Sequence, residues 1–236
     1  MKKDLLSLYD LDTKDFDIIW RKAGKLKKYL KAGKVHDSLK GKTLGMIFDK
    51  SSTRTRISFE VGMFQLGGIA LFLSSRDTQI GRGESIYDTA RIMSRYLNGI
   101  MIRTYAQEAV EEFARHATIP VINALSDGEH PCQALADAMT LRERFGALEG
   151  LKVAYVGDGN NCYLSLAIVC AKLGMHVTCA CPEGYDPDME TVAWADGVAR
   201  ERVGSVTVMR RSPLRSCSMR WRAGSRQSSG CALPPQ

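Results

Sequence analysis

Residues 49–60 read DKSSTRTRISFE, and this stretch decides how the chain around it folds. It follows the apolar run 44–48, which is typical of a short buried strand. It precedes apolar side chains that are typical of the buried side of a helix, namely Phe59, Val61, Met63, Phe64 and Leu66. The polar residues therefore lie where a strand turns into a helix, with a serine or threonine at the N-cap.

This strand-to-helix junction has the chemistry of an anion site. The first N–H groups of a helix have no partner inside the helix, and the helix dipole places about half a positive charge there. Hydroxyl side chains and the two arginines, Arg54 and Arg56, add further donors at the same point. We predict a phosphate cradle. The alternative is an ordinary capped helix with solvated arginines.

Strand and helix patterns alternate along the chain, which predicts an α/β fold with parallel sheets. After a helix at 13–31 capped by Thr13, strands are predicted at 43–48, 69–73, 99–103 and 119–123, with helices at about 54–66, 84–97, 106–116 and 131–145. A second series has strands at 152–156, 176–181 and 205–209 and helices at 160–174 and 187–202.

These elements predict two doubly wound parallel-sheet domains, of which the second is incomplete. The segment 145–150 marks the boundary, so the first domain is expected over 1–146 and the second over 147–209. Residues 210–236 lose the strand–helix alternation, and we expect them to be a disordered basic tail.

Ligands of open α/β sheets bind beyond the carboxyl ends of the strands, so the residues there are candidate site residues. A polar loop with Gln79 follows the second strand, and the third ends in Arg103. The fourth is followed by His130, Pro131 and Gln133. The start of the following helix would orient His130 toward the strand edge, where the side chain could donate a hydrogen bond to a carbonyl oxygen. The alternative interpretations are that the Gln79 loop is an ordinary surface loop, that Arg103 only ends a strand and that His130 has a structural role.

A competing interpretation comes from the loop after the strand at 152–156. Gly157 and Gly159, with Glu183 beyond the next strand, partly resemble a dinucleotide-binding fingerprint. Cys162 stands where the third glycine is expected, which opposes close approach of a pyrophosphate. An NAD-binding domain is therefore the alternative class.

The net charge of +7 belongs to the end of the chain. Residues 203–236 hold six arginines and no acidic residue, and the rest has 27 basic against 26 acidic residues. A nearly neutral body does not suggest a nucleic-acid partner. No apolar run approaches the roughly 18 residues of a membrane span, and the N-terminus lacks a signal sequence, so we expect a cytoplasmic protein. The seven cysteines lack metal-ligand spacing.

Four features together resemble the carbamoyltransferase family: the segment 52–60, the Gln79 loop, Arg103, and the HPCQ segment 130–133. The segments 77–81 (DTQIG) and 157–161 (GDGNN) are similar to those of its ornithine-specific members. An aspartate-specific member would continue with a His-Ser-Arg type sequence after Gly-Asp. The resemblance covers about residues 1–209.

The resemblance implies a reaction and a set of roles. The carbamoyl group of carbamoyl phosphate would pass to the δ-amine of L-ornithine, giving citrulline and phosphate in arginine metabolism, without a metal or organic cofactor. Residues implied to bind the phosphate are Ser52, Thr53, Arg54 and Thr55. Those implied to contact the carbamoyl group are Arg103, His130 and Gln133, while Asn161 would bind ornithine. Gln79 would reach the site from the neighbouring subunit of a homotrimer.

The chain departs from this family after Met209. The family's Asp-x-Trp-x-Ser-Met-Gly and His-Cys-Leu-Pro segments, which serve ornithine binding and the amine, are absent from the sequence. We interpret the change as a truncation or translated frameshift, with a natural basic tail as the alternative. Two functional hypotheses follow: an active ornithine carbamoyltransferase, or an inactive remnant that binds carbamoyl phosphate and oligomerises.

Overall fold

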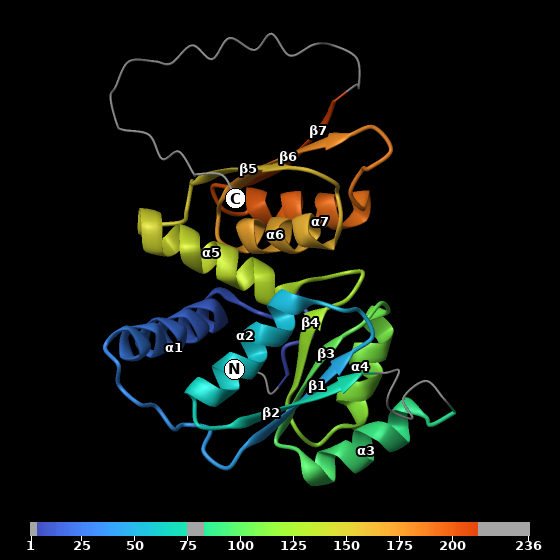
Figure 1. The fold of residues 1–236 in the computed structure, drawn as a ribbon. Coiled ribbons are helices and arrows are strands. Elements are labelled where there is room, and N and C mark those ends of the chain that lie inside the picture. The colour runs from blue at the N-terminus through green and yellow to red at the C-terminus, as the bar shows by residue number, and fades with distance from the viewer. Residues whose placement is uncertain (1–3, 75–82, 212–236) are drawn as a thin grey trace, which may run out of the picture.

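The computed structural model describes residues 4–74 and 83–211, which form two α/β units, one above the other in Figure 1. The first sheet contains β1 (Thr43–Phe48), β2 (Ile69–Ser74), β3 (Gly99–Arg103) and β4 (Val121–Leu125). The second contains β5 (Lys152–Val156), β6 (His176–Pro182) and β7 (Ser205–Arg211). All strand pairs are parallel, in the orders β2-β1-β3-β4 and β5-β6-β7.

The described residues contain seven helices, of which α1 precedes the first strand and the other six connect successive strands. They are α1 (Thr13–Lys31), α2 (Thr53–Gln65), α3 (Ile86–Tyr96), α4 (Gln107–His116), α5 (Pro131–Phe145), α6 (Asn161–Lys172) and α7 (Met189–Arg200). The predicted alternation is thus confirmed, with β4 shifted from 119–123 to 121–125 and β7 continuing two residues past its predicted end at 209. Arg210 and Arg211, expected in the disordered tail, are therefore strand residues, and residues 212–236 of that predicted tail lie outside the described residues. The cap of α1 is Asp12, not Thr13, because Asp12 and Asp15 form a reciprocal capping box.

The first sheet carries helices on both faces. Met46 and Phe48 of β1 pack with Met63 of α2, whereas Ile47 packs on the opposite face with α3 and α4. Because successive strand residues point to opposite faces, β1 contributes to both layers of the core. The chain moves outward from β1 to β2 and then back past β1 to β3. The direction of winding therefore reverses between β1 and β3 (Figure 1).

The predicted buried side of α2 is only partly correct. Met63 is buried, with Phe59 and Leu66 partly buried on the same face at intervals of four and three residues. Val61 and Phe64 lie on another face and are 44% and 80% exposed. Apolar content alone therefore overestimated the buried surface of this helix.

The second sheet is covered on one face in the described part of the chain. Val177, Cys179 and Cys181 of β6 point toward α6 and α7. Right-handed crossovers between strands added in one direction place both helices on the same side. Val156, on the other face, is 83% exposed. This one-sided cover agrees with the predicted incomplete second domain.

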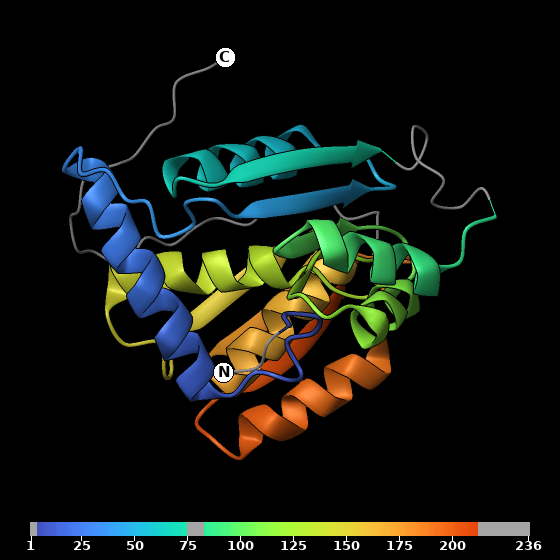
Figure 2. The ribbon, with the colours of Figure 1, turned by 90° about the horizontal axis from the view of Figure 1, so that it is seen from below.

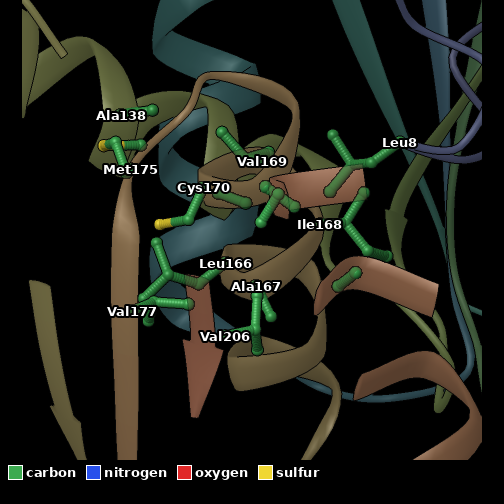
Figure 3. Packing of buried hydrophobic residues seen from close by; sticks show 14 of the residues in the cluster. Leu8, Ala138, Leu166, Ala167, Ile168, Val169, Cys170, Met175, Val177 and Val206 are labelled. Carbon is green, nitrogen blue, oxygen red and sulfur yellow. The ribbon is translucent and has the colours of Figure 1, made fainter. Parts of the chain in front are cut away.

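A single buried cluster joins the two units. Leu8 and Ala138 belong to the same cluster as Ile168, Val169 and Val177 of the second unit (Figure 3). Phe16 and Trp20 of α1 also belong to it. The N-terminal segment and α5 therefore share a core with α6, while the division after residue 146 stays a prediction.

Tyr163 provides a test of this core. Its side chain is fully buried, and its hydroxyl has no hydrogen-bond partner among the described residues. Because an unpaired buried hydroxyl is unfavourable, we expect Tyr163→Phe to raise the free energy of unfolding by up to about 1 kcal/mol. Urea unfolding measures this. Tyr155→Phe, which removes a hydroxyl 3.5 Å from Asn160 Oδ1, is the control and should change little. A loss of stability in Tyr163→Phe would contradict the packing described.

Candidate active site

The predicted strand-to-helix junction after β1 is confirmed. Ser52 is the N-cap of α2, and its Oγ accepts the backbone N–H of Thr55 at 3.2 Å. The same hydroxyl donates to Thr55 Oγ1 at 3.0 Å. The first turn of α2 thus begins at the carboxyl end of β1, beside the point where the winding reverses. Ligands of α/β sheets bind at such switch points.

Arg56 was predicted to add a donor at this junction, but it makes its contacts elsewhere. Its Nε donates to Glu60 at 2.9 Å, and its guanidinium lies 4.0 Å from the centre of the Phe72 ring. Because residues two apart on a helix face different ways, Arg54 and Arg56 separate. Arg54 alone of the two lines the cavity described below.

Hydrogen bonds fix this junction to the end of β3. The backbone N–H of Asp49 donates to the carbonyl of Arg103 at 2.9 Å, and Thr104 Oγ1 donates to the Asp49 carboxylate at 2.5 Å. Lys50 forms an ion pair with Asp127 in the loop after β4. Three strand ends are thereby held together.

A cavity of about 510 Å³ lies at these strand ends. It brings together six of the predicted site residues: Ser52, Arg54, Thr55, Arg103, His130 and Gln133. Thr53, at the first position of α2, is exposed and does not line it. Asn161 does not line it either, and Gln79 lies outside the described residues.

Arg103 and His130 give the cavity a cation and a neutral donor. Burial lowers the pKa of Arg103, and the guanidinium is still protonated at neutral pH. Burial, followed by the charge of Arg103, lowers the pKa of His130 to about 4, so its imidazole is neutral with one N–H. Arg103 Nε and His130 Nδ1 have no hydrogen-bond partner in the described part of the chain. Both nitrogens can therefore form hydrogen bonds with a polar ligand.

Of the predicted amide residues, the two in the described part of the chain are already hydrogen-bonded. Gln133 Nε2 donates to Asp137 at 2.9 Å at the cavity wall. Asn161 Nδ2 donates to the carbonyl of Ser126 at 2.5 Å, which joins α6 to the loop before His130. Both residues were predicted from the sequence as site residues, but their hydrogen-bond partners were not.

Seven lining residues had no predicted role in the site: Ser58, Phe59, Ala124, Leu125, Cys132, Ala136 and Cys162. Cys162 comes from α6 and brings the second unit to the cavity wall. The position of Cys162 directly after a strand-end loop could have indicated that it lines the site. From the sequence alone it was considered only as a replacement for the third glycine of a dinucleotide-binding fingerprint. Ser58 and Phe59 belong to α2, about two turns beyond the N-cap.

The glycines that suggested NAD binding serve local packing. Gly159 donates its N–H to the carbonyl of Tyr185 at 2.8 Å. A Cβ at Gly159 would lie 2.1 Å from the Pro187 nitrogen, so only glycine fits this contact. Packing against the segment 185–187 therefore accounts for the glycine at this position.

Two further findings concern residues 4–74 and 83–211 only. No helix there has the length and hydropathy to cross a membrane. No group of three or more His, Cys, Asp or Glu side chains there has an arrangement that would hold a metal ion.

The fold and the cavity define an α/β protein with a cationic cavity at the switch point of a parallel sheet. Residues 3–143 match the model of the aspartate/ornithine carbamoyltransferase carbamoyl-P binding domain, and residues 149–217 match that of the Asp/Orn binding domain. The chain therefore belongs to the aspartate/ornithine carbamoyltransferase family. The second match continues past Met209, where the resemblance was expected to end.

Individual relatives agree with this assignment. The chain is 60% identical over 210 residues to ornithine carbamoyltransferase of Syntrophus aciditrophicus, covering 89% of this chain and 68% of the relative. It is 52% identical to that of Methanocorpusculum labreanum, covering 92% and 70%. The solved structure of the Pyrococcus furiosus enzyme has a TM-score of 0.85 at 52% identity, covering 88% and 66%. The chain thus spans about two thirds of the length of these relatives.

The lowered pKa of His130 predicts a pH dependence of stability. Between its ordinary value of 6.5 and about 4, the unfolded chain binds a proton at this position that the folded chain does not. Stability is therefore lost as the pH falls through this window. His130→Gln should reduce the loss, measured by urea unfolding at about pH 7 and about pH 5. An equal loss in the parent and the variant would show that the buried imidazole does not cause it.

Proposed function

We propose that this chain descends from, and acts as, an ornithine carbamoyltransferase. The supporting observation is the single cavity that joins the N-terminus of α2 to Arg103 and His130. One end has the donors of an anion site, and the other has the donors of a carbonyl site. Carbamoyl phosphate carries both groups, which a dinucleotide-type site at residues 157–159 would not explain.

The phosphate end is formed by Ser52, Thr55 and Arg54, with Thr53 contributing as the first residue of α2. The first-turn N–H groups and the helix dipole favour an anion at this point. Arg54 adds a planar cationic donor that can bind phosphate through two hydrogen bonds. The same groups stabilise phosphate as it leaves.

The carbonyl end uses Arg103 and His130, with Gln133 beside them. Attack of the ornithine δ-amine on the carbamoyl carbon moves charge onto the carbonyl oxygen. The guanidinium and the neutral imidazole N–H stabilise that charge, as donors of an oxyanion hole do. Collapse of the tetrahedral species expels phosphate and gives citrulline.

The amine must lose a proton before it attacks. With a pKa of about 10.4, like that of lysine, about one molecule in 2,500 is neutral at pH 7. Holding ornithine at Asn161, on α6 beside the cavity, would supply orientation. Asn161 would have to exchange its bond to Ser126 for the substrate.

We propose further that the chain forms a homotrimer, acts in arginine metabolism and is cytoplasmic. The trimer is supported by exposed apolar side chains on α2 and β2, which lie side by side at one edge of the first unit (Figures 1 and 2). These side chains are Ile57, Val61, Phe64, Ile69, Leu71 and Phe72. Apolar side chains exposed at the edge of a sheet are typical of an interface. Gln79 from a neighbouring subunit would then complete the site.

A second candidate function is a non-catalytic protein that binds carbamoyl phosphate and oligomerises. It is favoured by the location of the cavity. The phosphate and carbonyl ends of the cavity lie almost wholly in the first unit, so anion binding does not require the second.

Arg54 and Arg56 form a matched pair for testing the phosphate end. We expect Arg54→Ala to weaken inorganic phosphate binding by about 10- to 100-fold, because a charged hydrogen-bond donor is lost. Arg56→Ala should leave it unchanged, since Arg56 pairs with Glu60 outside the cavity. Isothermal titration calorimetry measures both.

A citrulline assay on the same preparations separates the two candidates. Citrulline formation that disappears in Arg54→Ala supports the enzyme. Phosphate binding without citrulline supports the non-catalytic protein. Equal phosphate affinity in Arg54→Ala and the parent would contradict both.

The trimer is tested at Phe64. We expect Phe64→Glu to reduce the oligomer to a monomer, because a charge would be buried at the proposed interface. Light scattering after size exclusion reports the mass. Tyr96→Glu, at the equally exposed end of α3, is the control and should leave the mass unchanged. A Phe64→Glu variant with the parent's mass would place the interface elsewhere.

A further inference from the structure

We propose that Ser165, on α6 of the second unit, is a positioning residue for His130. Ser165 is fully buried, and its Oγ accepts the backbone N–H of His130 at 2.7 Å. The bond crosses from α6 to the start of α5. The proposal relies on the proposed function only for the role of His130 in catalysis.

The bond matters because the His130 ring has little else to hold it. Its Nδ1 is buried and has no partner in the described part of the chain, and the side chain makes no capping bond to α5. The location of the ring therefore depends on the backbone of His130. The carbonyl of this residue accepts the N–H groups of Gln133 and Ala134 in the first turn of α5. Its own N–H precedes the helix, and Ser165 satisfies it.

A second bond from α6 supports the same loop. Asn161 Nδ2 donates to the carbonyl of Ser126, and Asn161 and Ser165 are four residues apart on one helix face. The two bonds hold both ends of the loop 126–130 against α6. Between them, the buried carboxylate of Glu129 accepts the Leu8 N–H at 2.8 Å. The loop is thus fixed from the second unit and from the N-terminal segment.

This arrangement links the two substrate ends of the site. Asn161, proposed to contact ornithine, and Ser165, which holds His130, lie one turn apart on a rigid helix. A displacement of α6 when ornithine binds would reach the carbonyl-polarising imidazole through one hydrogen bond. Ser165 acts through His130 and touches no substrate.

Ser165→Ala tests the proposal, with Ser94→Ala as a matched control. Ser94 Oγ, on α3, likewise accepts a backbone N–H from another segment, that of Thr118 at 3.1 Å, and lies outside the cavity. Two readouts are used: the titration of the His130 ring by NMR with isotope-labelled histidine, and the calorimetric affinity for carbamoyl phosphate, whose carbonyl oxygen His130 is proposed to contact. The chain has four histidines, so His130→Gln assigns the signal.

We expect Ser165→Ala to raise the pKa of His130 from about 4 toward 6.5, because the freed loop exposes the ring. The affinity for carbamoyl phosphate should fall about fivefold to tenfold, because the displaced His130 would no longer donate to the carbonyl oxygen. Ser94→Ala should lose stability without changing either readout. A folded Ser165→Ala variant with the parent's titration and affinity would overturn the proposal.

A second variant covers the case in which Ser165→Ala does not fold. Ser165→Cys keeps the size of the side chain with a weaker acceptor, so both readouts should shift in the same direction but less. Unchanged values in this variant would also overturn the proposal. The Arg54→Ala experiment tests the proposed function separately. An unchanged phosphate affinity in that variant would contradict the proposed function, whereas the titration of His130 without ligand would still test the role of Ser165.

Discussion

The handedness of the crossovers is the constraint on which the site depends. Because a right-handed connection between parallel strands puts its helix on a face set by the direction of travel, the reversal between β1 and β3 places α2 opposite α3 and α4. It also leaves the carboxyl ends of two adjacent strands without a helix directly over them. The N-terminus of α2 and Arg103 meet there, which makes a cationic cavity a consequence of the winding.

A buried polar network then brings in the rest of the molecule. The loop between β4 and α5 contains Ser126, Glu129 and His130, and its polar groups pair with α4, α6 and the N-terminal segment. Buried polar groups are costly unless they are paired, so the network permits few alternative positions of the loop. The second unit thereby sets the geometry of a site whose anion-binding groups belong to the first.

Several features were predictable because they depend on local chemistry. The alternation of strands and helices, the serine cap of α2 and the grouping of Arg54, Arg103 and His130 follow from periodicity, capping and strand direction. The errors have equally physical causes. Arg56 turns away because a helix separates residues two apart, and Phe64 is exposed because apolar residues occupy two faces of α2. The cap of α1 moved to Asp12 because the capping box forms with Asp15.

By itself the sequence determined the class of fold, the order of elements and the residue types at each strand end, since these depend on neighbours along the chain. Tertiary structure alone decided which of those residues share one cavity, that Cys162 joins them, and that Asn161 and Ser165 hold the loop before His130. It also decided the pKa of His130, because burial and the charge of Arg103 come from residues distant in the chain. Such properties depend on packing between elements, for which local sequence patterns carry no signal.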